Sequence, residues 1–207
     1  PASPARLLNC YAEALPPDAK TPVLLTRAPG ITEWTEVGDG PIYGMHYAHG
    51  FLYVVSGTNL YRVSENKVSV LLGSIGSFEG LDMDSNTDTL VVINSQGGYY
   101  WDGSTFGAIT DTDFTSRLAG DVEFVDNWLL FREPSSGRFY GADLGTATDF
   151  DALNFATAEG YADNLVGMKV DHRQVLLFGT ESVELWENTG RSGFPFERSI
   201  NGLIEIG

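Results

Sequence analysis

The sequence predicts an all-β chain folded as a β-propeller of about four four-stranded antiparallel blades, standing alone or as part of a larger propeller. Three observations support this fold class: short β-rich runs alternate with polar turns, the pattern occurs four times, and a glycine opens each copy. The opening glycines Gly44, Gly80, Gly120 and Gly167 lie 36, 40 and 47 residues apart. A period of about 40 residues with four strands per copy is typical of a propeller blade. A β-sandwich with coincidental spacing is the alternative.

The first copy, residues 44–72, contains apolar and aromatic runs separated by breaks at 56–59 and 64–67. These breaks are rich in Ser, Gly and Asn, which favour the tight turns of a meander. Because a single meander cannot bury both faces, we expect the copies to pack against one another. The innermost strands should lie near 42–47, 79–83, 121–125 and 165–170. Alternate side chains of each second strand should then pack between blades: Leu52, Val54, Leu90, Val92, Leu129, Phe131, Leu176 and Phe178.

Residues 1–20 form a separate N-terminal arm, which precedes a propeller domain over 21–207 that is complete or interrupted at its C-terminal end. Apolar residues at helical spacing and the Pro16-Pro17 pair fit either a short helix or an extended arm. Residues 21–40 hold two strand candidates that would suit the closing strand of the ring. We expect Leu7, Leu8 and Tyr11 to dock onto a partner, because exposed apolar side chains on an arm mark interaction surfaces.

Residues 144–160 form a long excursion within the third copy and explain its larger spacing. Insertions in a propeller fall in loops at the rims, where partners bind. Asp149, Phe150 and Phe155 are therefore further candidates for partner docking.

The chain carries 28 acidic and 12 basic residues, for a net charge of −16. Such a surface repels phosphate, so direct binding of nucleic acid is not expected. No run is long and apolar enough to predict a membrane span, and no membrane contact is expected. Cys10 is the single cysteine, which excludes an intrachain disulfide and a cysteine-based zinc site.

No motif in the chain predicts catalysis, a cofactor or a bound metal. Residues 82–88 begin like a calcium loop, but Thr87 and Ile93 stand where that loop needs Gly and Glu, which favours a polar hairpin turn. His46 and His49 would face opposite sides of a strand. The pair Asp111 and Asp113 is better explained as loop acids than as a glycosidase pair. We therefore predict that the protein is not an enzyme.

The four tryptophans could stack on sugars in a lectin-like propeller. Three of them fall within blade strands, where packing between blades is the favoured use. The four tryptophans are Trp34, Trp101, Trp128 and Trp186.

Three stretches resemble the packaged-DNA stabilisation proteins, or tail accessory factors, of short-tailed bacteriophages. These are residues 6–31, with Asn9, Tyr11 and a closing Pro-Gly, residues 149–168, and residues 176–207. The last stretch contains Glu184, Trp186 and the run FPFER. The family members are longer, so the chain resembles their N-terminal part or a short relative.

The resemblance implies a non-enzymatic structural protein of the virion, assembled in the host cytoplasm as a homo-oligomeric ring below the portal. Its expected partners are portal-side tail proteins, tailspikes and the plug or needle protein. It would act as a tail hub that helps to retain packaged DNA by closing the exit channel. A carbohydrate-binding propeller for host recognition is the alternative. A sialidase-like propeller is disfavoured, because residues 101–105 are only a faint echo of its repeated box.

Overall fold

A computed structural model describes residues 9–205, and the chain divides between Glu36 and Val37 into two compact units. In the first unit, β1 (Cys10–Ala14) and β2 (Val23–Arg27) form an antiparallel hairpin. The boundary expected after residue 20 is therefore too early, because pairing with β2 holds the following residues in the same unit. The expected closing strand is also wrong, since β2 pairs with β1 and not with a blade.

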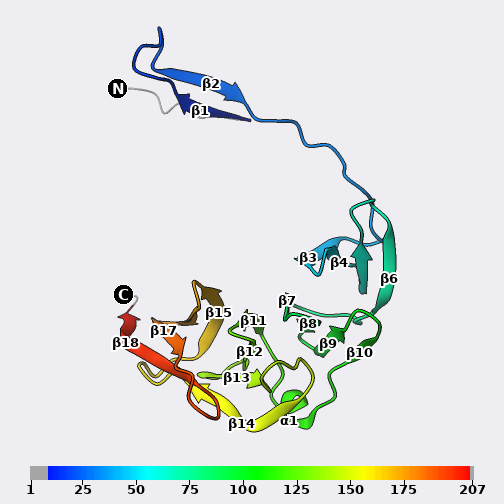
Figure 1. Ribbon diagram of the computed structural model, residues 1–207, viewed down its shortest axis with the longest axis vertical. Helices are drawn as coiled ribbons and strands as arrows, with labels where there is room; N and C mark the ends of the chain where they lie inside the picture. Colours follow the sequence, from blue (N-terminus) through cyan, green and yellow to red (C-terminus); the bar gives the residue numbers. More distant parts are fainter. Residues whose placement is uncertain (1–8, 206–207) are drawn as a thin grey trace. The chain divides into compact units, whose positions relative to one another are not determined.

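The second unit contains four four-stranded antiparallel sheets, which we call blades 1 to 4 (Figure 1). Each blade is a meander, so its strands pair in the order in which they occur in the chain. Blade 1 comprises β3 (Ile42–Ala48), β4 (Phe51–Ser56), β5 (Asn59–Val63) and β6 (Ser69–Ser74); blade 2 comprises β7 (Leu81–Ser85), β8 (Leu90–Asn94), β9 (Gly97–Trp101) and β10 (Phe106–Ala108); blade 3 comprises β11 (Asp121–Val125), β12 (Trp128–Arg132), β13 (Arg138–Ala142) and β14 (Phe150–Thr157); blade 4 comprises β15 (Leu165–Asp171), β16 (Gln174–Gly179), β17 (Ser182–Asn188) and β18 (Phe196–Glu205).

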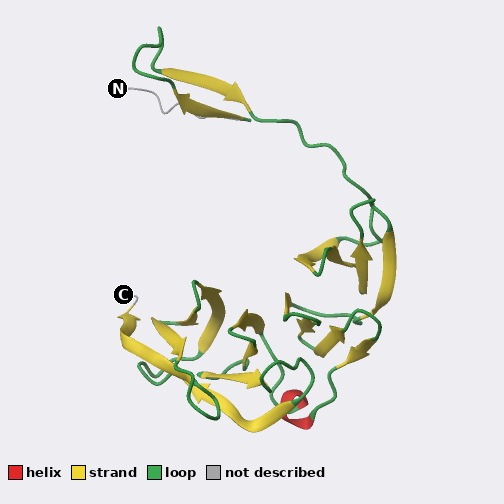
Figure 2. Cartoon of the chain, viewed as in Figure 1, coloured by secondary structure: helices red, strands yellow, loops and turns green. Residues whose placement is uncertain are grey.

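Strands dominate the part of the chain that the structure describes, and the single helix there is α1 (Thr112–Thr115), drawn red in Figure 2. No helix among these residues is both long and apolar enough to span a membrane. The prediction of an all-β chain with four four-stranded antiparallel blades is confirmed.

The first strand of each blade is its innermost one, as predicted. Strand β7 contacts β3 on one side and β11 on the other, and β11 contacts β15. The predicted equivalence of the four opening glycines holds only for Gly80 and Gly120, which directly precede β7 and β11. Gly44 and Gly167 lie inside their strands, each at a register shift. At Gly44 a Cβ would come within 2.6 Å of a methyl group of Leu81, so a larger residue there would require the side chain of Leu81 to move.

The core lies between successive blades. Tyr53 and Val55 of β4 pack with Leu90 and Val92 of β8, and two further clusters join blade 2 to blade 3 and blade 3 to blade 4. Of the eight side chains predicted to pack between blades, four are fully buried in these clusters: Leu90, Val92, Leu129 and Phe131.

The other four predicted residues belong to blades 1 and 4. Val54 is buried, whereas Leu52, Leu176 and Phe178 are half-buried. Because side chains alternate along a strand, these four point away from the neighbouring blade of this set. The prediction is therefore correct for blades 2 and 3 and off by one residue in blades 1 and 4, where the side chains between blades are Tyr53, Val55, Val175 and Leu177.

The tryptophans of the blades serve packing, as favoured by the sequence. Trp128 and Trp186 lie in the cluster between blades 3 and 4, and Trp101 packs against the cluster between blades 1 and 2.

Candidate functional site

The inner strands of the propeller are joined by carboxylates that reach from one blade to the next. In β7, Asp82 Oδ2 accepts a hydrogen bond from the backbone N–H of Val122 at 3.1 Å. Two residues along, Asp84 Oδ2 accepts from the N–H of Phe124 at 2.6 Å. Both donors belong to β11 and would face the inner strand of blade 2 without a sheet partner. Two side chains thus continue the hydrogen bonding across a boundary that no sheet crosses.

The same device joins blade 3 to blade 4. Glu123 of β11 accepts a hydrogen bond from the N–H of Val170 at 3.2 Å, and the ammonium of Lys169 donates to its other oxygen. The Lys169 ammonium also lies 3.7 Å from the Asp82 carboxylate. Between blades 1 and 2, His46 Nε2 lies 3.0 Å from Ser85 Oγ. Side chains of all four blades therefore form one polar belt along the inner strands.

Placing carboxylates in this partly buried belt costs electrostatic free energy, and the pKa values of two of them are shifted accordingly. Burial raises the pKa of the Asp82 and Glu123 carboxyls above their ordinary values, against the opposing effects of Lys169 and the backbone N–H donors. Burial would lower the pKa of Lys169, but its hydrogen bond to Glu123 and the charge of Asp82 raise it overall. Lys169 therefore remains the cation that balances two carboxylates.

The residues considered for chemistry in the sequence have structural contacts instead. Asp111 caps α1, accepting from the N–H of Asp113 at 2.8 Å. His46 and His49 contact different groups, since His46 Nε2 lies beside the Ser85 hydroxyl and His49 Nε2 lies 2.9 Å from the carbonyl of Asn86. Asn86 itself closes the turn after β7, which is the hairpin expected for the calcium-like stretch. Within residues 9–205, no group of His, Cys, Asp and Glu is arranged to hold a metal ion.

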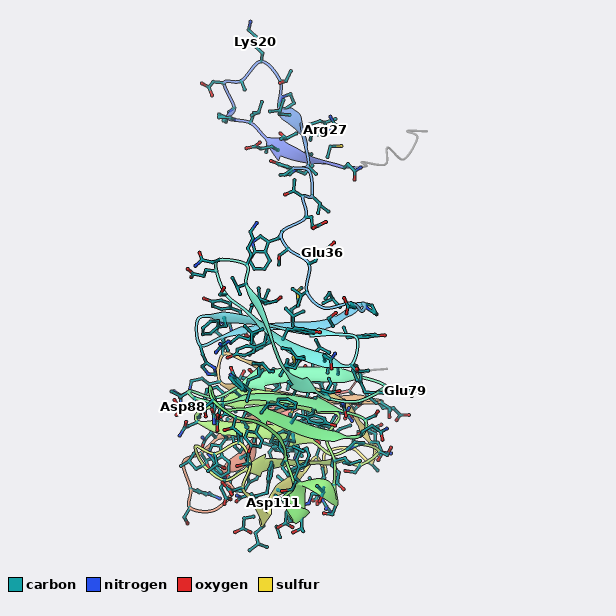
Figure 3. All side chains as sticks on the ribbon, turned by 90° about the vertical axis from the view of Figure 1, so that its right-hand side faces the viewer. Lys20, Arg27, Glu36, Glu79, Asp88 and Asp111 are labelled. Atoms are coloured by element: carbon teal, nitrogen blue, oxygen red, sulfur yellow. The ribbon has the colours of Figure 1, made fainter. Side chains whose placement is uncertain are left out.

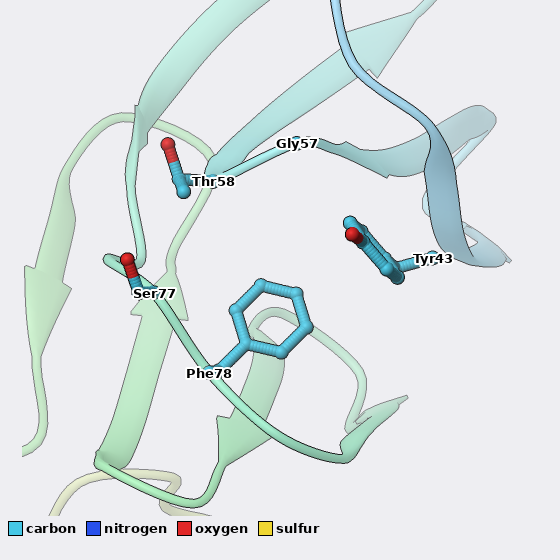
Figure 4. A pocket seen from close by; sticks show the side chains of 5 residues that line it. All are labelled: Tyr43, Gly57, Thr58, Ser77 and Phe78. Atoms are coloured by element: carbon cyan, nitrogen blue, oxygen red, sulfur yellow. The ribbon is translucent and has the colours of Figure 1, made fainter.

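A depression on blade 1 is lined by two aromatic rings and two hydroxyl residues (Figure 4). Tyr43 and Phe78 meet edge to face with ring centroids 5.3 Å apart. Gly57, Thr58 and Ser77 complete the lining, and no charged side chain contributes to it. Its chemistry suits a neutral ligand with both apolar and hydroxyl groups.

The docking candidates of the N-terminal arm are described only in part. Leu7 and Leu8 lie outside the described residues. Tyr11 lies on β1, where its side chain is 50% exposed. On β2, Leu24 and Leu25 are similarly exposed. Side chains extend from this hairpin on both sides in Figure 3, where Lys20 projects from the turn between the strands. A two-stranded hairpin of this kind has too little core to be stable by itself.

The docking candidates of blade 3 are separated by the structure. The expected excursion over 144–160 is wrong in part, because β14 pairs with β13 as the fourth strand of the blade. Phe150 is 7% exposed and packs against Phe114, so its assignment as a docking residue is corrected to a core role. Asp149 is exposed, and Phe155 is 37% exposed.

The sequence does not predict that two arginines lie around Phe155. The Cζ atoms of Arg138 and Arg117 lie 4.7 Å and 5.7 Å from the centroid of the Phe155 ring. Arg117 follows α1 in the chain, whereas Arg138 begins β13, so no local spacing links them. The pairing of β13 with β14 brings Arg138 to Phe155, and the contact of the α1 segment with β14 brings Arg117 there.

Comparison with known proteins gives a family and a fold. Residues 7–207 match the phage stabilisation family described as "Bacteriophage P22 Gp10, beta-propeller". No curated protein matches the chain.

Three solved structures illustrate the likeness in fold. The β-propeller domain of Cps50 (Swd1) from Myceliophteria thermophila is 9% identical with a TM-score of 0.61, over 88% of this chain and 66% of that one. A structure described as YCF48 bound to D1 peptide is 13% identical with a TM-score of 0.55, over 86% of this chain and 58% of that one. The WD40 domain of Pan2 from Neurospora crassa is 9% identical with a TM-score of 0.54, over 81% of this chain and 53% of that one.

The chain thus spans between half and two thirds of the length of these solved propellers. At such low identity the likeness concerns the fold alone. It agrees with the four meanders.

Proposed function

Because the chain belongs to the phage stabilisation family described as "Bacteriophage P22 Gp10, beta-propeller", we propose that it is a structural protein of the virion, a tail hub that binds below the portal. In this role it helps to retain packaged DNA by closing the exit channel as part of a homo-oligomeric ring. Its partners are portal-side tail proteins, tailspikes and the plug or needle protein. It assembles in the host cytoplasm and acts without catalysis.

The observation that carries this proposal beyond the family match is the exposed hairpin of the first unit. Tyr11, Leu24 and Leu25 are between 48% and 59% exposed on two short strands. A hairpin with so little buried surface gains stability when a partner covers its apolar face or extends its edges. Docking by this element leaves the blades intact, because the core of the second unit contains none of its residues.

Retention of DNA by closure, and not by binding of phosphates, follows from the charge of the chain. A protein of net charge −16 repels a polyanion, and non-specific DNA binding depends on clustered Lys and Arg. Much of the basic charge here is paired with carboxylates: Arg132 with Asp121, Arg138 with Glu133, Lys169 with Glu123, Arg173 with Asp126, Arg191 with Glu197 and Arg198 with Glu184.

Deletion of residues 1–36 from the gene in its phage tests the proposal. We expect particles that fill with DNA but lose it, and that lack tail proteins, while the purified variant retains the β-sheet circular dichroism of the blades. Normal tailed particles from this deletion would contradict the role of the hairpin. Tight binding of the purified chain to duplex DNA at physiological salt would contradict retention by closure.

Carbohydrate binding is the second candidate function, favoured by the depression on blade 1. Its aromatic rings and hydroxyl groups, without a charged side chain, are the kind of lining that a neutral sugar contacts. Titration with polysaccharide from the host surface separates the candidates. Saturable binding that Tyr43→Ala abolishes supports the second candidate, and no binding by the intact chain removes it.

A further inference from the structure

A groove of about 540 Å³ opens between the rims of blades 3 and 4. Asp143 after β13, with Asp151 and Asn154 of β14, lines it from blade 3, and the loop at residues 189–195 between β17 and β18 lines it from blade 4. Trp128 adds an apolar surface to the lining. We call this feature the acidic groove.

The acidic groove presents hydrogen-bond acceptors that residues 9–205 leave unsatisfied. One oxygen of Asp143 accepts from the side-chain amide of Asn154 at 2.8 Å, and one oxygen of Asp151 accepts from the backbone N–H of Leu153 at 2.8 Å. The second oxygen of each carboxylate and the amide oxygen of Asn154 have no donor among these residues. Asn154 is only 9% exposed, and a buried acceptor without a donor is unfavourable. A ligand for the groove must therefore supply donors.

The arginines of this region do not neutralise the acceptors. Arg191 lines the groove, but its guanidinium is paired with Glu197. Asp126, which also lines the groove, is paired with Arg173. Arg117 does not line the groove, since its guanidinium donates to the carbonyl of Ala152 and lies against the ring of Phe155.

The remaining carboxylates make the groove negative. Burial raises the pKa of the Asp143 carboxyl above its ordinary value, and the negative charges of Asp151, Asp149 and Asp111 raise it further. In the part of the chain that the structure describes, none of these four aspartates forms an ion pair with a Lys, Arg or His. A cation in the groove would balance this charge.

We infer that the acidic groove binds an arginine side chain of a partner protein, whose guanidinium donates to Asp143, Asp151 and the amide oxygen of Asn154. A guanidinium carries five N–H donors and no acceptor, which matches a lining of unpaired oxygens. The aliphatic stem of the arginine packs on Trp128. A metal ion suits the groove less well, because no group of His, Cys, Asp and Glu within residues 9–205 is arranged to hold one. The inference rests on the proposed function for the existence of protein partners, although its test needs no phage.

The test uses the complete chain and a capped tripeptide with arginine between two glycines. The matched probe replaces arginine by citrulline, whose neutral urea group has nearly the same shape. Titrations are followed by the amide resonances of the protein. We expect the shifts to cluster on residues 143–154 and 189–195, and binding to weaken as salt is added. The citrulline peptide should bind at least about tenfold more weakly, the usual loss for removed charge-assisted hydrogen bonds.

A pair of variants separates the groove from the net charge of the protein. The double substitution Asp143→Asn, Asp151→Asn should weaken binding of the arginine peptide at least about tenfold. The matched control Glu65→Gln, Asp88→Asn removes the same charge from exposed turns of blades 1 and 2 and should bind as the native chain does.

The comparison of the two peptides on the native chain needs no variant, so it decides the matter even if the double variant unfolds. Absence of binding, equal binding of the arginine and citrulline peptides, or shifts away from the groove would each overturn the inference. Equal weakening by the control variant would also overturn it, because net charge alone would then account for the binding. Such outcomes remove the site and leave the proposed role in the tail intact, which the hairpin deletion tests separately.

Discussion

The carboxylate of Asp84 in blade 2 accepts a hydrogen bond of 2.6 Å from the backbone N–H of Phe124 in blade 3. The two residues are 40 positions apart, one repeat of the blade pattern. A side chain thus stands where a neighbouring strand would stand in a continuous sheet. Propeller blades pack by their faces, and here their inner strands are also joined by polar contacts.

Loss of this contact should destabilise the protein. We expect Asp84→Ala to reduce the free energy of unfolding by about 1 to 3 kcal/mol, because it leaves a partly buried N–H without an acceptor. Denaturant unfolding followed by circular dichroism measures the change. Asp88→Ala is the matched control, since that side chain is exposed in the turn after β7 and should change stability by less than about 0.5 kcal/mol. Equal stability of the two variants would mean that the belt does not stabilise the fold.

The belt should also give stability a dependence on pH that one substitution removes. Burial raises the pKa of Glu123 above its ordinary 4.5 in the folded protein, so the folded state binds a proton more readily than the unfolded state does. The contribution of Glu123 to stability is therefore highest below that value and falls as the pH rises through the folded pKa.

Unfolding of the native chain and of Glu123→Gln at a series of pH values checks this sign. The variant should gain stability relative to the native chain as the pH rises above 4.5. A difference that shrinks or reverses with rising pH would indicate that Lys169 and the Val170 N–H outweigh burial.

Two leucines in equivalent strands should respond differently to truncation. Leu129 is fully buried between blades 2 and 3, and we expect Leu129→Ala to cost about 2 to 5 kcal/mol. Leu176 is half-buried on the outer face of blade 4, so Leu176→Ala should cost markedly less. The comparison uses the same chemical change in the second strand of two blades. Equal costs would mean that the outer face of blade 4 is as well covered as an interface between blades.

Much of the fold could be predicted because the information is local and repeated. The apolar second strands and their turns mark each meander, and the glycine period sets the number of blades. The turns were harder to predict: His172 and Arg173 form a two-residue hairpin turn with φ of 47° and 67°, although arginine is not among the residues that favour positive φ. There the pairing of β15 with β16 sets the conformation of the turn, and His172 and Arg173 adopt positive φ to fit it.

The errors have a common cause, which is pairing between distant residues. Residues 150–157 lack the turn signals of the other blades, so the sequence does not predict their pairing with β13. Cys10–Ala14 has no clear alternation, and its strand forms because β2 lies opposite. Arg117 and Phe155 meet only after both the helical turn and the outer strand are in place. Contacts of this kind leave no periodic pattern in a single sequence.

The most direct test is a map of the intact tail at a resolution that traces side chains. The account predicts four-bladed density below the portal, with the hairpin at residues 9–27 covered by a neighbouring protein and Tyr11, Leu24 and Leu25 in that contact. Density of this chain elsewhere in the particle, its absence from the virion, or a hairpin surrounded by solvent in the assembled tail would contradict it.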